Sequence, residues 1–391
     1  MRVDIESLGT FSRTAHEGAE RAARNLTGMT GIETAVDVTG VSLCSADALA
    51  RDDRERIGVV VEFEGAVTGQ SVLSFPPEGV ETLLDALLPG AELRDSAIRE
   101  VGNVVTSGFV DAWADHLETT IDLSPPSRID GTPADLFDAV GFERDRAVVF
   151  RSRASAVGER LDFEFHMFPD PDSLAAMLAD GGGEIPVEKL TALREVARAG
   201  ARTASESVSA MTGIDTTVDV SHLSFVPIED VPAELSGREH VGVVLEFEGA
   251  PGGYMMILFD EPSAREVVAA LVPGVEEVES FDGMNRSAIQ EIGNVMTSSF
   301  VDGWANVLDA TIDISTPQFV HDMGRAVADS VVARLGQRQS FAFLFDATLR
   351  ADDRSFDCQL YAIPDETELR SVLADLDPDA TAERTTKAGS L

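Results

Sequence analysis

The sequence SAIREVGNVVTSGFVDAW at residues 96–113 returns as SAIQEIGNVMTSSFVDGW at residues 287–304, with thirteen of eighteen positions identical. The only two tryptophans of the chain end the two copies. At about 100° per residue, a Ser, a Glu and an Asn of each copy fall on one narrow stripe, and the apolar residues fall on the opposite side. Each copy is therefore predicted to be a helix that carries a polar stripe. The stripe residues are Ser96, Glu100 and Asn103 in the first copy and Ser287, Glu291 and Asn294 in the second.

A glycine lies in the middle of each predicted helix, beside the stripe: Gly102 in the first copy and Gly293 in the second. Glycine inside a helix costs up to about 1 kcal/mol relative to alanine. Because both copies keep this cost, we expect another element to pack closely against the helix backbone at these two positions.

The repeat extends beyond the two helices and predicts two domains. MTGIETAVDV at residues 29–38 returns as MTGIDTTVDV at 211–220, and GVVVEFEGA at 58–66 returns as GVVLEFEGA at 242–250. Insertions that change the offset between copies belong in surface loops. The predicted organisation is a first unit at 1–180, a glycine-rich linker at 181–186, a second unit at 187–375 and a disordered tail at 376–391.

Each half has the same predicted order of elements. The first half reads as a helix at 6–28, strands at 33–43, 57–64 and 69–75, a helix at 77–88, the motif helix, a short helix or loop, strands at 147–152 and 161–168, and a helix at 171–179. The second half reads as a helix at 187–210, strands at 215–225, 240–248 and 253–259, a helix at 261–271, the motif helix, strands at 340–347 and 356–363, and a helix at 366–374. Alternating apolar and polar residues, as in LDFEFHMF, indicate half-buried strands. The pattern predicts an α/β (α+β) fold with an antiparallel-rich sheet and helices packed on it.

The chain of 391 residues carries a formal net charge of −39, and Lys189 and Lys387 are its only lysines. So acidic a surface repels phosphate backbones and anionic lipids, which makes nucleic acid and membranes poor partners. Disorder is disfavoured because 44% of the residues are apolar and follow clear periodicities. The composition resembles that of halophilic proteins that work in molar salt.

This acidic surface leads to a prediction about salt. The melting temperature is expected to rise strongly between about 0.1 M and about 3 M KCl, because the Debye length falls from about 10 Å to about 3 Å or less and screens the self-repulsion. Circular dichroism melts across this range measure the effect. A flat response would contradict the halophilic interpretation.

Several kinds of site have no signature in the sequence. There is no glycine-rich phosphate loop, and the six histidines, which we assign to the surface or to a satisfied core, show no spacing of metal ligands. No metal site is therefore predicted. The chain also lacks a run of about 18 apolar residues and an apolar N-terminal signal, so we expect a cytoplasmic protein.

The polar stripe has two readings. A Glu with an Asn three residues later is usually the solvated face of an amphipathic helix, and a recent duplication would copy it without a function. However, the helices that open the two halves have diverged heavily while Ser, Glu and Asn have not changed. Asparagine is also a poor helix former in the middle of a helix, so propensity does not explain its presence twice.

The pattern Ser-x3-Glu-x2-Asn-x22-Pro resembles that of the CheC/CheX/FliY family of chemotaxis phosphatases. It is completed by Pro126 in the first half and Pro317 in the second, and the strings EVGN and EIGN are typical of the family. The chain looks like a tandem CheC from a halophilic, archaeal source. The resemblance implies two CheC-like units, each a largely antiparallel sheet with two long pseudo-symmetric helices packed on it.

A family unit also carries a related Glu/Asn pair on its first helix. The first half has Arg13 and His16 at those positions, and the second half has Glu195 and Arg198. Neither pair is complete, so one competent site per half, on the motif helix, is expected.

The resemblance also implies an activity, the removal of the phosphoryl group from the aspartyl phosphate of a CheY-type response regulator. Asn103 and Asn294 would position the attacking water, and Glu100 and Glu291 would dock on the receiver's lysine. Ser96 and Ser287 would contact the partner. The protein would need no cofactor of its own, since the required Mg²⁺ belongs to the response regulator.

Two other functions compete with this one. The chain could be a non-catalytic adaptor that binds the deamidase CheD, phosphorylated CheY, or both, because half of the family's sites are lost. A motor-switch component resembling FliY is disfavoured, because no further domain of that type follows the second unit. Loss of phosphatase activity in a variant without Asn103 and Asn294 would separate the phosphatase from the adaptor.

Overall fold

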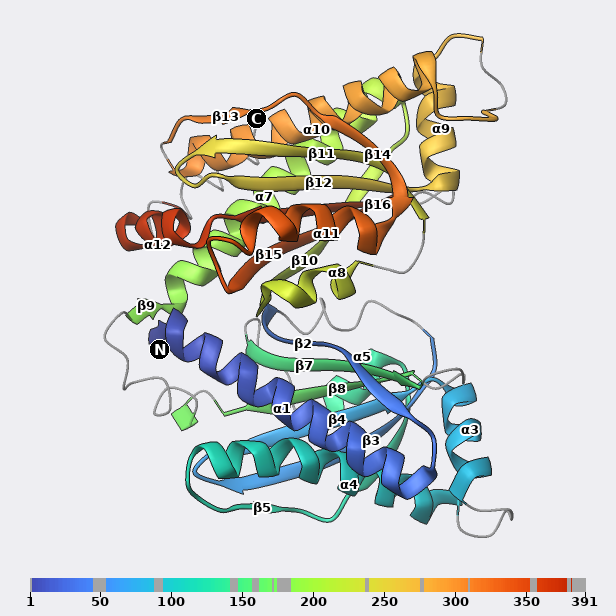
Figure 1. Ribbon diagram of the computed structural model, residues 1–391, viewed down its shortest axis with the longest axis vertical. Coiled ribbons are helices and arrows are strands. Elements are labelled where there is room, and N and C mark those ends of the chain that lie inside the picture. Colours follow the sequence, from blue (N-terminus) through green and yellow to red (C-terminus); the bar gives the residue numbers. More distant parts are fainter. Residues whose placement is uncertain are drawn as a thin grey trace. The chain divides into compact units, whose positions relative to one another are not determined.

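The structure is a computed structural model that describes residues 2–44, 54–87, 94–140, 147–156, 162–170, 172–173, 184–235, 239–274, 278–308, 310–351, 357–377 and 381 (Figure 1). The chain divides into two compact units, which hold Met1–Glu184 with Phe225–Asp230 and Ile185–Ser224 with Val231–Leu391. Residues 181–183 of the predicted linker lie outside the described residues, and Glu184–Pro186 form the short strand β9. Of the predicted tail only Leu376, Asp377 and Thr381 are described, and Leu376 is buried. The exact domain boundaries stay a prediction.

Unit 1 is one antiparallel sheet with helices packed on it. Its described elements are β1 (Arg2–Asp4), α1 (Ile5–Thr30), β2 (Thr34–Cys44), β3 (Arg56–Gly65), β4 (Gly69–Phe75), α3 (Pro77–Leu87), α4 (Arg94–His116), β5 (Ile121–Leu123), β6 (Ser127–Gly131), α5 (Pro133–Ala139), β7 (Ala147–Ala156) and β8 (Asp162–Pro169). The strand order is β2-β7-β8-β4-β3, and β5 and β6 both pair with the outer side of β3. Every pairing in this order is antiparallel.

Unit 2 repeats this plan. Its elements are α7 (Val187–Thr212), β10 (Thr216–Pro227), α8 (Val231–Glu234), β11 (Glu239–Gly249), β12 (Gly253–Asp260), α9 (Glu261–Leu271), α10 (Gly283–Leu308), β13 (Ile312–Ile314), β14 (Gln318–Met323), α11 (Gly324–Leu335), β15 (Phe341–Ala351), β16 (Asp357–Pro364) and α12 (Glu366–Asp375). The 3-10 turn η2 (Ile228–Asp230) and the last residues of β10 group with unit 1. The order β10-β15-β16-β12-β11 matches that of unit 1, with β13 and β14 on the outer side of β11. The predicted α/β fold of two repeated units is confirmed.

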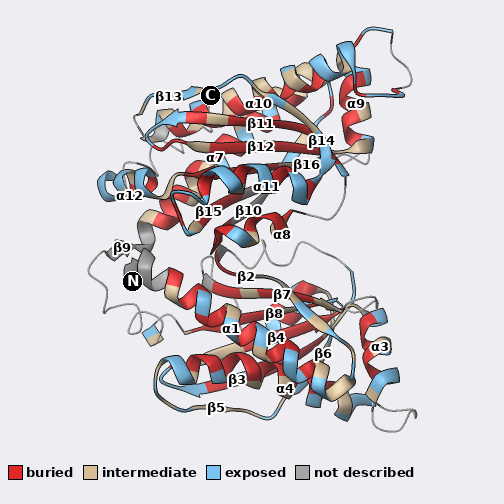
Figure 2. Ribbon diagram, in the orientation of Figure 1, coloured by how far each residue is buried: buried red, intermediate tan, exposed pale blue. Residues whose placement is uncertain are grey.

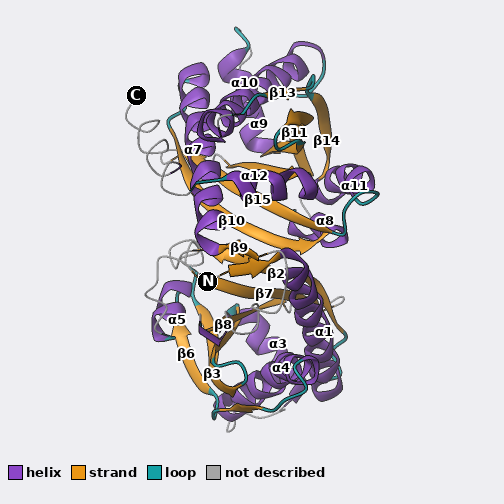
Figure 3. Ribbon diagram, turned by 90° about the vertical axis from the view of Figure 1, so that its left-hand side faces the viewer, coloured by secondary structure: helices purple, strands orange, loops and turns teal. Residues whose placement is uncertain are grey.

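In each unit a pair of long helices lies on one face of the sheet. Helix α1 packs along α4 in unit 1, and α7 packs along α10 in unit 2. Figure 3 shows α1, α3 and α4 on one side of the unit 1 sheet, with α5 on the other. The described residues contain no helix long and apolar enough to cross a membrane.

The apolar side of the motif helix forms the core of unit 1, as its periodicity predicts. Ile98, Val101, Val105 and Phe109 are all buried, and Trp113 is 2% exposed. The ring of Trp113 meets the rings of two neighbouring elements, Phe11 at 5.1 Å and Phe150 at 4.6 Å. Figure 2 shows the same pattern along the chain, with buried residues in the central strands and exposed residues on the outer sides of the helices. Burial of one side of α4 leaves its polar stripe at the surface.

The close packing expected at the two glycines is present. A Cβ atom at Gly102 would lie 2.3 Å from Val59 Cγ1 on β3, and one at Gly293 would lie 2.3 Å from Val243 Cγ2 on β11. The backbone of each motif helix therefore rests directly on a valine of the neighbouring strand. This contact sets the height of the stripe above the sheet.

Replacing Gly102 with alanine is expected to lower the free energy of unfolding by about 1 kcal/mol, because overpacking of about 1–3 kcal/mol outweighs a gain in helix propensity of about 1 kcal/mol. Adding Val59→Ala to the same chain should recover part of the loss. Gly28 of α1 is the control, since a Cβ there has nothing within 4 Å. Denaturant titrations of the three variants measure this, and equal effects of G102A and G28A would contradict it.

The structure differs from the prediction after each motif helix. The expected short helix or loop of the first half is two short strands, β5 and β6, followed by α5. In the second half β13, β14 and α11 occupy the same place. Of the helix predicted at 171–179, only Asp172 and Ser173 are described, and both are helical. The additional strands widen each sheet and form one wall of the site.

Candidate functional site

The polar stripe of α10 lines an open hollow of about 430 Å³ in unit 2. Its lining residues are Ser287, Gln290, Glu291 and Asn294 of the helix and Ile314, Ser315, Thr316 and Pro317 of the segment between β13 and β14. All four positions of the Ser-x3-Glu-x2-Asn-x22-Pro pattern therefore meet in one place. The pattern's spacing therefore joins Asn294 of the helix to Pro317, which lies more than twenty residues later in the loop that follows the helix.

The loop wall of the hollow is fixed to the sheet. Ser315 donates its backbone N–H to the carbonyl of Glu246 over 2.8 Å and accepts the N–H of Glu246 on its hydroxyl over 2.9 Å. Ser124 and Glu62 make the same pair of bonds in unit 1, both 2.9 Å long. Because β11 and β3 are each paired with strands on both sides, these bonds hold the loop beside the stripe.

The helix side of the hollow is tied to the same loop. Gln290 donates its side-chain N–H to the carbonyl oxygen of Pro317 over 3.1 Å. Pro317 thus contributes a carbonyl that closes the hollow's edge, as well as fixing the turn into β14. Ser287 donates its hydroxyl to the carbonyl of Gly283 over 3.1 Å, within the first turns of the helix.

The Glu and Asn side chains of both stripes are available to a partner. Glu100 and Glu291 are exposed, whereas Asn103 and Asn294 are half-buried. Within the described part of the chain, none of these four side chains has a recorded hydrogen bond or ion pair. A recessed carboxamide beside a protruding carboxylate can hold a small polar molecule and contact a cation at the same time.

The first helices do not supply a second stripe. Arg13 and Arg198 are exposed, and Glu195 accepts a hydrogen bond from Arg194 over 3.2 Å. Helix α1 and helix α7 therefore present cationic or self-paired groups where the related pair would stand. Among the described residues, no group of three or more His, Cys, Asp or Glu side chains is arranged to hold a metal ion.

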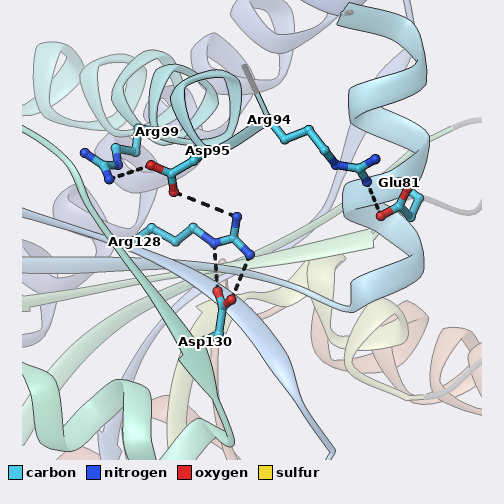
Figure 4. A network of polar contacts seen from close by, with 6 residues as sticks. All are labelled: Glu81, Arg94, Asp95, Arg99, Arg128 and Asp130. Atoms are coloured by element: carbon cyan, nitrogen blue, oxygen red, sulfur yellow. Dashed lines mark hydrogen bonds and ion pairs between the residues drawn. The ribbon is translucent and has the colours of Figure 1, made fainter. Parts of the chain in front are cut away.

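The rims of the two stripes differ in charge. In unit 1, Asp95 of α4 lies between two arginines, with its carboxylate 2.5 Å from Arg99 and 3.8 Å from Arg128 (Figure 4). In unit 2, the equivalent rim holds Arg286, whose guanidinium lies 5.0 Å from the centre of the Phe319 ring. These rim residues differ between the two copies, so the repeat does not single them out; their positions next to the motif are the signal that the sequence offers.

Comparison with known proteins places the motif helices in one family. A model of the CheC-like family matches residues 93–129 and 284–321, which contain both stripes and both prolines. A protein of Halobacterium salinarum named "Putative CheY-P phosphatase CheC1" is 40% identical over 182 residues, covering 46% of this chain and 92% of its own length. The CheY-P phosphatase CheC of Bacillus subtilis is 21% identical over 188 residues, covering 46% of this chain and 90% of its own length.

Among solved structures, Thermotoga maritima FliY is similar over 45% of this chain and 96% of its own, with 19% identity and a TM-score of 0.38. The halophilic source predicted from the composition is supported by the Halobacterium relative. Because that relative is matched over nearly its whole length at 40% identity, and both motif helices match the family model, the chain belongs to the CheC-like family.

Proposed function

We propose that this protein dephosphorylates the aspartyl phosphate of a CheY-type response regulator, with one site on α4 and one on α10. The observation that supports the proposal most is the meeting of all four motif positions at one hollow, with the Glu and Asn side chains unpaired and accessible. Two relatives are named as CheY-P phosphatases. Such a protein would act in chemotaxis signalling in the cytoplasm, where its partner is phosphorylated.

The proposed role of Asn103 and Asn294 is to position water. A receiver's aspartyl phosphate has its charge balanced by a metal ion and a lysine, and what it lacks is a water held in line with the P–O bond. A carboxamide can accept a hydrogen bond from that water and donate one to a neighbouring oxygen without adding negative charge. The water oxygen attacks phosphorus, the acyl P–O bond breaks, and the receiver's aspartate leaves as a carboxylate while both protons of the water stay with inorganic phosphate, as dihydrogen phosphate.

The proposed role of Glu100 and Glu291 is docking. Each lies one turn before its asparagine on the same face of the helix, where neighbouring Cβ atoms are about 5–6 Å apart. The carboxylate would pair with the receiver's lysine and so fix the depth at which the asparagine enters the partner's site. Ser96 and Ser287, one further turn along the stripe, would contact the partner's surface. The Mg²⁺ would come with the response regulator.

An adaptor function is the second candidate, and the first helices favour it. The first half has Arg13 and His16 at the related positions, and the second keeps Glu195 but has Arg198 for the asparagine. Each unit therefore keeps a single stripe, and the remaining surface is open to other partners. The chain would then bind CheD, phosphorylated CheY, or both, with little turnover.

The experiment that tests the proposal is phosphate release from a CheY-type receiver charged with acetyl phosphate, in molar KCl with Mg²⁺. The full-length protein is expected to accelerate release at a catalytic ratio to receiver. Binding of the receiver or of CheD without acceleration would support the adaptor and overturn the phosphatase.

A further inference from the structure

Each motif helix contacts the equivalent strand of its own unit through a charged side chain, but the two contacts differ. The repeat offset of 191 residues makes Asp95 equivalent to Arg286, and Arg128 equivalent to Phe319. Each pair joins the start of a motif helix to the strand that follows the pattern's proline, β6 in unit 1 and β14 in unit 2. An Asp–Arg pair in one unit therefore corresponds to an Arg–Phe pair in the other.

In unit 1 the guanidinium of Arg128 is already neutralised. It donates from Nε to Asp130 over 2.8 Å and from Nη2 to the same carboxylate over 2.7 Å, and its Nη1 lies 3.8 Å from Asp95. The hydrogen bond to Asp130 raises the pKa of Arg128 above its ordinary value. Figure 4 shows this guanidinium between the two carboxylates, with Arg99 on the far side of Asp95. Two arginines and two aspartates cancel, so this rim carries no net charge.

In unit 2 the carboxylates of this network have been replaced. His321 stands at the position of Asp130 and Gln290 at that of Arg99, so neither carboxylate of the unit 1 network has an acidic counterpart here. His321 lies 3.4 Å from Glu239 and faces the ring of Phe281. Among the residues that the structure describes, the one recorded contact of the Arg286 side chain is the Phe319 ring.

An aromatic ring holds a guanidinium in place without cancelling its charge, since the attraction comes from the ring's quadrupole. The N–H groups at the edge of the plane stay able to bind a carboxylate or phosphate in a forked geometry. Arg286 directly precedes Ser287, and Phe319 follows Pro317 by two residues, so this group stands at the rim of the hollow. On a chain of net charge −39, it is a local exception to the repulsion of anions.

We propose that Arg286 binds the anionic groups of the phosphorylated receiver, the phosphoryl oxygens or the carboxylates around them, and makes unit 2 the preferred docking site. This inference rests on the proposed function, and it names a residue outside the Ser, Glu and Asn pattern. Unit 1 presents the same stripe, but the arginine at its rim is already paired. A receiver that binds there must compete with Asp95 and Asp130 for Arg128.

The test measures the affinity of the full-length protein for a receiver charged with beryllofluoride, in about 2 M KCl, without turnover. E100R closes the stripe of unit 1 and E291R closes that of unit 2, because each reverses the charge that faces the receiver's lysine. With unit 1 closed, R286Q is expected to raise the Kd about fivefold, the size expected for loss of one exposed charge pair. With unit 2 closed, the matched R128Q is expected to change the Kd less than twofold.

A second variant keeps the proposal testable if R286Q disturbs the rim. Phe319→Asp places a carboxylate beside Arg286, as in unit 1, and should also raise the Kd about fivefold in the E100R background. No change with R286Q or F319D would overturn the assignment, even if phosphate release is normal. If the Kd values change as expected but no phosphate is released, the binding role of Arg286 is supported and the proposed phosphatase activity is overturned. Absence of receiver binding in both backgrounds would overturn both.

Discussion

Replacing Asn103 and Asn294 together with alanine is expected to reduce the rate of phosphate release by at least about 100-fold, the usual cost of losing a group that positions or stabilises the reacting atoms. The affinity for the receiver should change less than about twofold, because the docking contacts of Glu100 and Glu291 stay intact. The measurements are single-turnover phosphate release and binding of a beryllofluoride-charged receiver. Both asparagines are half-buried at the surface, so neither change should disturb the core.

The single variants make the prediction sharper. Each should abolish phosphate release only at the site of its own unit. The decreases in rate of the two single variants should therefore add up to the decrease in the double variant. Asn306 is the matched control, because it is an exposed asparagine on α10 that lies outside the stripe. N306A should release phosphate at the wild-type rate. A double variant that keeps its activity would show that the stripes are not the catalytic elements.

The long elements of the fold were predictable from the sequence because they carry their own periodicity. The motif helices, predicted at 96–113 and 287–304, extend to Arg94–His116 and Gly283–Leu308. The repeat then identified the stripe, because comparison of two copies of one helix distinguishes the residues that stay constant from those that vary. The expected contact at Gly102 follows from the same comparison, because a glycine that costs stability twice needs a close neighbour.

The short edge strands were not predictable in the same way. Strands β5 and β6 form through pairing with β3, more than fifty residues earlier in the chain, and none of their residues is buried. Pro125 and Pro126 lie between them and indicate a loop. Helix α5 did have a local signal, since Thr132 and Asp135 form a capping box around Pro133. The site depends on these segments, because the wall of the hollow comes from their counterparts in unit 2.

The rim of each site shows the limit of the motif. The pattern and the repeat identify residues that are identical in the two halves. In the rim contacts, however, the arginine comes from the strand in unit 1 (Arg128) and from the helix in unit 2 (Arg286). Only the structure shows that a guanidinium is placed beside both stripes, and that one of the two is neutralised. Functional differences between the units are therefore expected at the rim, while the common chemistry is expected on the stripe.

The stability of unit 1 is expected to fall as the pH drops from about 6.5 towards 4, because His166 is buried in its neutral form. His166 is 3% exposed on β8, stacked on Phe168 at 6.2 Å and edge-on to Phe137 at 5.3 Å. Its Nδ1 has no hydrogen-bond partner among the described residues, which differs from the satisfied core position expected for a buried histidine.

Burial lowers the pKa of His166 from 6.5 to about 4; Glu164 acts to raise it, and Arg151 and Arg56 act to lower it further. The unfolded chain binds a proton at His166 below about pH 6.5, whereas the folded chain does so only near pH 4. Between these values the unfolded state holds more protons, so the free energy of unfolding rises with pH. The contribution of His166 to the free energy of unfolding changes by about 1.4 kcal/mol per pH unit. It is fully present above pH 6.5, and about 3 kcal/mol of it is lost by pH 4.

The measurement is urea unfolding of wild type and His166→Phe between about pH 5 and pH 7, in molar KCl, where most carboxylates stay ionised. Phenylalanine fits an aromatic cluster and removes the titrating group, so H166F should lose less stability than wild type over this range, by about 2 kcal/mol at pH 5. Acidic residues that do not interact with His166 titrate in both proteins and cancel in the difference, and Glu164 is the one that does interact with it. Parallel pH profiles for the two proteins would mean that His166 is not the group responsible, and that its ring is hydrated or paired when the protein is folded.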